Sequence, residues 1–496
     1  MPGNETRARA RLVGTVRWSA LDGFATIASS VLTLLLLGWY FSPQQVGLAG
    51  IAVATVMIIE VISGLGMREA IIRSGKGGTR ESDTAHTLVI VGTAMGILVA
   101  LGAAFALSAA FASEELAPLI IVAAATLPLN AVSAIATALQ TRRLRARHTE
   151  LRSVTTRLVT VAALWILGAL GLGALAIVLA GVIAAMISPA VTLATTRRWP
   201  QLRYDAGHAR LLLRFGLIAG LDDLLHVLSV RGFILLFGLI HGAVALGQMQ
   251  LALRAVDELS RVIQSGAWRF GAAFFSKLEA GSDAMARAYV DLSRVLFAVA
   301  APLFAGLAVV GPLAVPLVLG QSWAPSGAFL QLMALGWLLA FPFLLNRPVL
   351  RAVGAPAIST AWTTANALIA FAGTIATAPL GASWGVASWA LRDVPSQPLV
   401  SAYVYRRLEL NVVGHLGGLF RIALAVVIMA TVVAAILSAP LHAAVTLGVA
   451  VLAAAVVYPL ALLALDRATF ARIRRLLPGQ GDPVSGERLS ESMTNE

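Results

Sequence analysis

The chain has 496 residues, of which 58% are hydrophobic and only 12% are charged, whereas soluble domains carry about 25% charged residues. This composition excludes a soluble globular protein and indicates a polytopic membrane protein. The formal net charge is +13, but the arginines fall in short clusters between apolar stretches, as topology signals do, so we expect no nucleic-acid partner. The absence of cysteine excludes disulfides, thiol catalysis and Cys-ligated metal sites.

Apolar runs long enough to cross a bilayer, roughly 17 to 25 residues, recur along the whole chain. We count about 14 of them, which predicts an all-α polytopic membrane protein. The predicted spans are 18–40, 46–67, 85–111, 117–139, 154–172, 174–195, 212–240, 243–266, 289–319, 327–346, 357–378, 383–404, 416–437 and 441–465.

The connections between these spans alternate in charge. Arginines cluster in the N-terminal tail, in the connection after every even-numbered span and in residues 467–475, whereas the intervening connections contain neither lysine nor arginine. Positive charge stays on the cytoplasmic side, so this pattern predicts an even number of spans with both termini cytoplasmic. The opposite connections are too short for a soluble domain or an extended catalytic loop.

An internal repeat suggests how the spans are grouped. Residues 200 positions apart match without a gap, among them Asp22 with Asp222 and Gly47 with Gly247. Six helices separate the copies, so both halves enter the membrane in the same direction, as parallel repeats about an axis normal to the bilayer. We therefore expect an N-terminal tail (1–17), a six-helix lobe (18–200), a second six-helix lobe (201–408), two further helices (409–466) and a disordered cytoplasmic tail (467–496).

Span 243–266 carries a charged face. Arg254, Asp257, Glu258 and Arg261 follow one another at helical spacing, so they share one side of the helix. A central charge in lipid costs about 2.5 to 3.5 kcal/mol, so this face must line protein or a watery cavity. Either an arginine fork binds a phosphate there, or the four residues form a self-neutralising ladder that only makes a buried helix tolerable.

Span 212–240 carries a second set of charges, Asp222, Asp223, His226 and Arg231, and Asp222 has its repeat partner in Asp22. Carboxylates and an imidazole inside a bundle can take up H⁺ or Na⁺ as the cavity opens to either side. The alternative is a static set of ion pairs with neighbouring arginines.

Two further spans hold isolated charges. Glu60 is a lone carboxylate in span 46–67 and needs a partner on another helix or a proton. Arg392 and Asp393 precede two prolines in span 383–404, which can break the helix and expose carbonyls to a cavity; the alternative is a neutralised pair beside a kink. Tryptophans near predicted interfaces are expected to be membrane anchors. These are Trp18, Trp39, Trp268 and Trp323.

No nucleotide-binding phosphate loop, nucleophile elbow or zinc-binding helix motif occurs in the sequence. We therefore expect neither a bound metal nor a cofactor, and an ion gradient is the simplest energy source.

Four stretches resemble the oligosaccharide-lipid flippases of bacterial polysaccharide synthesis, in the superfamily that also holds lipid II flippases and multidrug and toxin extruders. They are FSPQQVGLAGIAVA, LPLNAVSAIATALQTRRLRAR, LLLRFGLIAGLDDLL and HGAVALGQMQLALRAVDELSRVI. The resemblance implies two six-helix lobes around a central cavity, two extra helices and alternating access. The implied substrate is an undecaprenyl-diphosphate-linked oligosaccharide, moved across the bacterial inner membrane for capsule, O-antigen or exopolysaccharide synthesis.

On this interpretation the protein is a secondary transporter and not an enzyme. Its partners would be the lipid-linked oligosaccharide, membrane lipid, a coupling H⁺ or Na⁺, and a polysaccharide polymerase and glycosyltransferases. The expected diphosphate-binding residues are Arg231, Arg254, Arg261 and Arg392, and the remaining charges form a network or couple ions. A multidrug or cation antiporter of the same superfamily remains the alternative; a membrane glycan polymerase or ligase is disfavoured because it would be expected to carry a large basic external loop.

Overall fold

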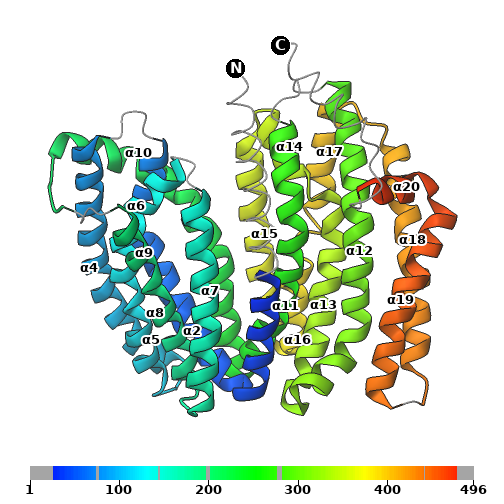
Figure 1. Ribbon diagram of the computed structural model, residues 1–496, viewed down its shortest axis with the longest axis horizontal. Coiled ribbons are helices and arrows are strands. Elements are labelled where there is room, and N and C mark those ends of the chain that lie inside the picture. The colour runs from blue at the N-terminus through cyan, green and yellow to red at the C-terminus, as the bar shows by residue number, and fades with distance from the viewer. Residues whose placement is uncertain are drawn as a thin grey trace, which may run out of the picture. The chain divides into compact units, whose positions relative to one another are not determined.

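The computed structural model of the protein describes residues 26–73, 78–142, 146–196, 201–275, 282–440 and 442–476. Throughout these ranges the backbone forms helices joined by turns and short connections, without a strand (Figure 1). The predicted all-α class is therefore confirmed. Asp22 and Trp18 lie outside the described residues.

The chain divides into two compact units. The first comprises Met1–Glu258, Val318–Phe329 and Thr363–Trp389. Its helices are α2 (Pro43–Ser63), α3 (Met67–Arg73), α4 (Thr79–Ala110), α5 (Leu116–Ala124), α6 (Thr126–Arg142), α7 (Ala146–Ala169), α8 (Ala174–Ala185), α9 (Ile187–Thr196), α10 (Ala206–Val227), a π-helical turn (Leu228–Gly232), the start of α11 (Phe233–Phe275), the start of α13 (Ala324–Ala340), most of α15 (Pro356–Ala376) and most of α16 (Ala382–Ala390).

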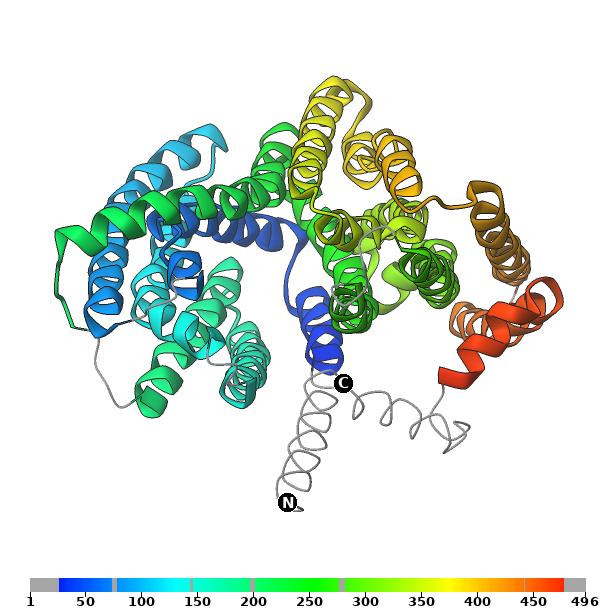
Figure 2. The same ribbon diagram turned by 90° about the horizontal axis from the view of Figure 1, so that it is seen from above.

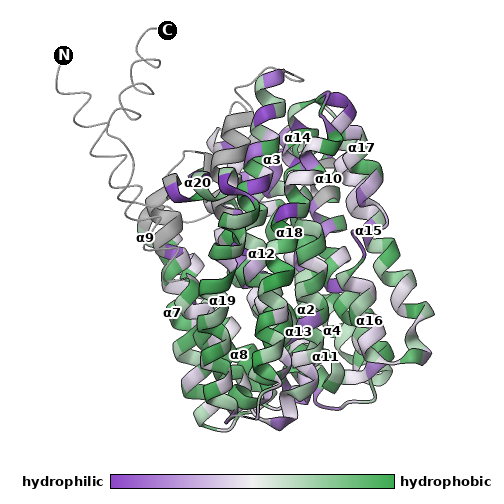
Figure 3. Ribbon diagram, turned by 90° about the vertical axis from the view of Figure 1, so that its right-hand side faces the viewer, coloured by the Kyte–Doolittle hydropathy of each residue, from purple (hydrophilic) through white to green (hydrophobic). Residues whose placement is uncertain are grey.

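The second unit comprises Leu259–Leu317, Leu330–Trp362 and Ala390–Glu496. Its helices are the end of α11, α12 (Asp283–Leu319), most of α13 (Ala324–Ala340), α14 (Asn346–Ala352), the start of α15 (Pro356–Ala376), α17 (Gln397–Arg407), α18 (Val412–Leu437), α19 (Ala443–Leu465) and α20 (Arg467–Leu476). Helix α20 occupies residues that we expected to be disordered. Its polar residues contrast with the apolar length of α19 (Figure 3).

Helices occupy all of the predicted spans that the structure describes. Nine stretches among the described residues are long and apolar enough to cross a membrane, so the chain is a multi-pass membrane protein. The other predicted spans fall on shorter or more polar helices, such as the apolar stretch Thr26–Tyr40 and α7. The number of about 14 crossings therefore stays a prediction.

The start of α2 follows directly from its sequence. Ser42 accepts a hydrogen bond from the backbone N–H of Gln45 at 3.3 Å, and the Gln45 side chain accepts one from the Ser42 N–H at 2.9 Å. This is a capping box, and Pro43 occupies the first helical position, where no N–H is needed. The short connection SPQQ thus fixes where the second span begins.

Glycines matched by the 200-residue offset meet each other where α2 and α11 cross. A Cβ on Gly47 would lie 1.9 Å from the carbonyl oxygen of Ala243, and a Cβ on Gly247 would lie 1.7 Å from the carbonyl oxygen of Pro43. Residue 243 is itself 200 positions after residue 43, so the two contacts are related by a local pseudo-twofold. Only glycine permits this backbone-to-backbone approach in either copy.

The prediction that Trp323 is a membrane anchor is wrong. Its side chain is fully buried, and its indole N–H donates to the carbonyl oxygen of Gly38 at 3.1 Å. The indole N–H of Trp39, by contrast, bonds to the carbonyl of Val318 while the ring stays exposed. Trp323 therefore ties the end of the first span to the connection before α13.

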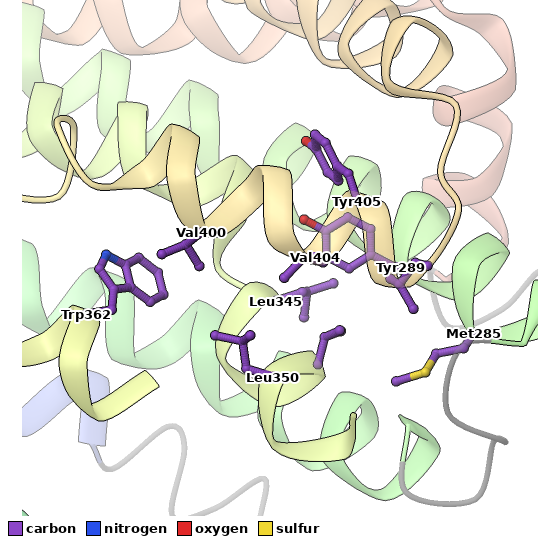
Figure 4. Close-up of a cluster of buried hydrophobic side chains, with 10 residues drawn as sticks. Met285, Tyr289, Leu345, Leu350, Trp362, Val400, Val404 and Tyr405 are labelled. Carbon is purple, nitrogen blue, oxygen red and sulfur yellow. The ribbon is translucent and has the colours of Figure 1, made fainter. Parts of the chain in front are cut away.

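A cluster of buried hydrophobic side chains forms the core of the second unit (Figure 4), and a series of buried hydrogen bonds starts from its Tyr289. The Tyr289 hydroxyl donates to the Asn346 side-chain oxygen at 2.7 Å, and the Asn346 amide donates to the Ser401 hydroxyl at 3.1 Å. The rings of Tyr289 and Tyr405 meet edge to face. These hydrogen bonds join α12, α14 and α17. They also satisfy buried polar groups, each of which would be costly to leave without a hydrogen bond.

Candidate functional site

The first unit contains a polar cavity of about 370 Å³. Its wall is built by residues of α2, α3, α4, α6, α7, α9 and α10, and thus by helices that sequence separates widely. Charged and hydrogen-bonding side chains converge on it, namely Glu60, Arg68, Glu69, Asn130, Arg152, Ser188 and Asp223. Such a set is unusual inside a bundle of membrane-spanning helices, where ionisable groups are rare and mark functional paths. We refer to it as the first-unit cavity.

Glu60 reaches the first-unit cavity from α2. The side-chain amide of Asn130 on α6 donates a hydrogen bond to its carboxyl oxygen Oε1 at 3.0 Å. The partner expected on another helix is therefore present, but it is neutral. Asn130 supplies a hydrogen bond without supplying a counter-charge, so the Glu60 carboxyl is a group that can exchange a proton or bind a cation.

Arg152 also lines the first-unit cavity, where it contributes a positive charge and is surrounded by hydroxyl groups. Its Nη1 atom donates to the hydroxyl of Thr137 at 2.6 Å and to that of Ser188 at 3.3 Å, and Ser188 in turn donates to Ser133 at 2.9 Å. The positive charge of Arg68 also acts on this guanidinium. Two like charges held together favour an anionic or hydrogen-bond-accepting ligand.

Glu69 and Asp223 form a carboxyl pair at the edge of the cavity. Glu69 lies in α3, outside the candidate spanning helices, and its carboxyl hydrogen-bonds to that of Asp223 on α10. Burial raises the pKa of Glu69, and the negative charge of Asp223 adds to this, against lowering contributions from its own backbone amide and from Arg68. The protonated form of Glu69 is thus favoured at this edge of the cavity.

The backbone of α3 sets the position of Glu69. Gly66 has a φ of +64°, and a Cβ there would lie 1.9 Å from the carbonyl oxygen of Gly216 on α10. Gly220, one turn further along α10, also meets Gly66, since a Cβ on Gly220 would lie 2.9 Å from the Gly66 Cα atom. This glycine contact brings the turn before α3 directly onto α10, which carries Asp223 three residues later.

The other charges predicted in span 212–240 are dispersed. His226 is exposed, the side chain of Asp222 is not described, and Arg231 lies in the π-helical turn between α10 and α11. The negative charge of Asp257 acts on Arg231. Single π-turns inside helices are frequent at functional sites, so the local geometry agrees with a role for Arg231 without showing one.

The predicted charged face of span 243–266 lies on one helix, α11, which is regular after Gly242. Arg254, Asp257 and Glu258 belong to the first unit, and Arg261 belongs to the part of α11 in the second unit. None of the four is among the residues that line the first-unit cavity. Their binding to a phosphate therefore stays a prediction.

Arg392 and Asp393 lie in the turn between α16 and α17, so the helix break predicted from the prolines is confirmed. The Arg392 Nε and Asp393 Oδ2 atoms are 3.8 Å apart. Asp393 also lines a cavity of about 730 Å³ in the second unit, together with polar groups of α17 and apolar side chains such as Leu339 and Phe343. We refer to it as the second-unit cavity.

Sequence reasoning found Glu60 and Asp223 but missed their neighbours. Arg68 and Arg152 lie at the ends of predicted spans, where the sequence indicated topology signals, and the structure turns both toward the first-unit cavity. The available signal was a basic residue within one helical turn of a span that also carries hydroxyl groups. Asn130 gave no signal beyond being an amide inside an apolar run.

Residues 36–328 match the family described as polysaccharide biosynthesis protein. The chain belongs to that family. A curated relative, the succinoglycan biosynthesis transport protein ExoT of Rhizobium meliloti (strain 1021), is 22% identical over 350 residues, which cover 70% of each chain.

Two solved structures show the fold of this polysaccharide biosynthesis family member. The lipid II flippase MurJ in an inward closed conformation has a TM-score of 0.73 at 12% identity, over 90% of this chain and 99% of that one. An inward-facing multidrug resistance MATE family transporter of the MOP superfamily has a TM-score of 0.63 at 14% identity, over 78% and 98%. The helical arrangement is therefore that of the exporter superfamily that the sequence resembles.

Proposed function

We propose that the protein is a secondary transporter that moves a lipid-linked oligosaccharide across the bacterial cytoplasmic membrane for polysaccharide synthesis. Family membership, the succinoglycan transport relative and the fold shared with a lipid II flippase support this. The observation that carries it is the first-unit cavity, which places carboxyl, amide, hydroxyl and guanidinium groups together among membrane-spanning helices.

The mixed chemistry of this cavity suits a glycan headgroup. Sugar hydroxyls both donate and accept hydrogen bonds, so they can use the Glu60 and Asn130 pair as well as the hydroxyls around Arg152. A diphosphate would be held by an arginine fork, and Arg231, Arg254, Arg261 and Arg392 remain proposed for that contact.

Ion coupling belongs to the same proposal. Glu60 and the Glu69–Asp223 pair are carboxyls in contact with the cavity, and each can change its protonation or bind Na⁺ when the cavity changes the side to which it opens. The proposed orientation has both termini in the cytoplasm, with the arginine-rich connections on that side. Glycosyltransferases would supply the substrate, and a polymerase would consume it.

A multidrug or cation antiporter is the second candidate, because three carboxyls line the first-unit cavity and the fold is shared with a MATE transporter. The two functions differ in a simple measurement. An antiporter would lower the sensitivity of a host lacking its drug exporters to cationic drugs, and this lowering would be lost in Glu60→Gln.

The decisive experiment uses the source bacterium with its chromosomal copy deleted and variants supplied in trans. We expect deletion to remove surface polysaccharide and to accumulate the lipid-linked intermediate on the cytoplasmic leaflet. Arg152→Gln should weaken substrate binding by about 10- to 150-fold, since a hydrogen bond to a charged group contributes about 1.5 to 3 kcal/mol. Arg152→Lys keeps the charge but loses the planar fork, and should recover only part of the activity.

The matched control is Arg210→Gln, which removes an exposed arginine from the start of α10 and should leave polysaccharide unchanged. Protein abundance is measured by immunoblot in every strain. Normal polysaccharide in Arg152→Gln would remove the first-unit cavity from the proposal. Normal polysaccharide in the deletion strain would refute the transport function itself.

A further inference from the structure

The short helix α20 follows α19 after a single residue. Asp466 caps it: its Oδ1 atom accepts the backbone N–H of Thr469 at 3.0 Å, and its Oδ2 atom accepts the Thr469 hydroxyl at 2.7 Å. Both residues are buried. A capping residue worth about 1 kcal/mol therefore ends the spanning helix and starts a new helix in a new direction.

Helix α20 is fixed to the second unit on one side. Arg472 forms an ion pair with Asp291 of α12 at 2.5 Å, and Thr469 on the same side is 1% exposed. Phe470 and Ile473 are half-buried. The helix thus has an inner face, held by a buried cap and an ion pair, and it does not depend on a ligand for its position.

The outer face of α20 is basic. Arg467, Ala471 and Arg474 are exposed, and spacings of four and three residues place them on one side of a helix. Both views of the ribbon show α20 lying across the direction of its neighbours α18 and α19 (Figures 1 and 2). The arginines are therefore spread along a line parallel to the membrane plane.

We infer that the outer face of α20 binds the headgroups of anionic phospholipids. The position follows from connectivity: α19 packs against α18, but it is apolar along its length and mostly unburied, so much of its surface faces lipid, and α20 begins two residues beyond its end. The first turn of α20 is then at the depth of the headgroups, a few ångströms beyond the hydrocarbon core of about 30 Å.

The chemistry of this face selects an anionic lipid over a neutral one. A helix with a basic face and an inner apolar face is the ordinary form of an interfacial helix, and each Arg near a negatively charged leaflet contributes roughly a fivefold gain in binding. An acidic protein segment could satisfy the same charges, but it would have to compete with the lipid that already surrounds α19.

The test uses the purified full-length protein. Native mass spectrometry measures the retention of phosphatidylglycerol and of phosphatidylcholine with the same acyl chains, titrated into detergent. We expect the wild type to retain phosphatidylglycerol preferentially. The double variant Arg467→Gln/Arg474→Gln should lower its apparent affinity by about 25-fold, with phosphatidylcholine unchanged. Raised ionic strength should weaken phosphatidylglycerol binding in the wild type.

Two further variants separate a defined site from general surface charge. Arg210→Gln/Arg214→Gln removes the same charge from exposed positions of α10 and should leave most of the preference intact. Ala471→Glu places a negative charge between the two arginines and should repel the lipid while the thermal stability stays that of the wild type. Equal retention of the two lipids by the wild type, or an equal loss in the α10 variant, would overturn the inference.

Discussion

Replacing the glycines at the crossing of α2 and α11 tests whether the internal repeat has a structural purpose. Gly47→Ala and Gly247→Ala each add one methyl group at a backbone contact. The added Cβ would start 1.9 Å from the Ala243 carbonyl oxygen in one case and 1.7 Å from that of Pro43 in the other. Neither obstacle is a flexible side chain, so it cannot rotate away.

The size of the effect follows from these distances. Restoring the 3.4 Å of ordinary contact from 1.9 or 1.7 Å requires the helices to separate by about 1.5 Å or more, against a close-packed interior. Overpacking of this kind costs about 1 to 3 kcal/mol. Alanine also favours a helix over glycine by up to about 1 kcal/mol, so the net destabilisation of each single variant should be roughly 0 to 2 kcal/mol.

The double variant sharpens the expectation. Because both methyl groups act on one crossing, the separation that accommodates the first also relieves part of the second, and the double variant should cost less than the two single costs together. The apparent melting temperature in detergent ranks the stability of the variants, and it is measured from the loss of the monodisperse peak on heating. Gly102→Ala is the matched control, since a Cβ there meets nothing within 4 Å and alanine should be neutral or stabilising. Single variants as stable as Gly102→Ala would refute the reasoning.

Three other predictions follow from the charged and buried groups. Arg254→Ala and Arg261→Ala should abolish surface polysaccharide at normal protein abundance; normal polysaccharide in both would refute their diphosphate contact. Trp323→Phe should lower the melting temperature, because the buried carbonyl of Gly38 loses its hydrogen-bond donor at a cost of about 1 to 3 kcal/mol. An unchanged melting temperature would show that this carbonyl finds another donor. Because the folded-state pKa of Glu69 is raised above 4.5, its ionisation should lower the wild-type melting temperature as pH rises from 4.5 through that pKa; Glu69→Gln should remove this slope, and a slope that persists would assign it to another group.

The spans were predictable because hydrophobicity and length are local properties of the sequence. Every predicted span that the structure describes is helical, and even the break near Pro395 was visible. The error at Trp323 has a physical cause. A tryptophan at the end of a span can direct its indole N–H to water or to a carbonyl of a neighbouring helix. The residues beside it in the sequence are the same in both cases, so they do not show which orientation it takes.

The first-unit cavity was only partly predictable for the same reason. Glu60 and Asp223 stood out because a carboxyl in an apolar run is costly wherever it points. Arg68 and Arg152 sit where the topology rule also requires arginine, so sequence could not separate an inward guanidinium from a cytoplasmic one. Only the packing of α3 and α7 against their neighbours decides between these positions.

The repeat also separates two kinds of constraint within the fold. The crossing of α2 and α11 needs glycine in both copies, because each backbone meets the other, and Gly47 and Gly247 are indeed matched. The groups of the first-unit cavity have no such counterparts: the residues 200 positions after Glu60 and Arg68 are Ser260 and Trp268.

A ligand needs each recognising group only once, so selection that preserves a symmetric contact leaves the chemistry of the two copies free to diverge. The arginines of span 243–266 and the pair Arg68 and Arg152 would then be independent acquisitions on one scaffold. Positive charge is accordingly present at the first-unit cavity as well as on α11. Removing either set alone should therefore weaken recognition of an anionic lipid-linked substrate while leaving the crossing of α2 and α11 intact.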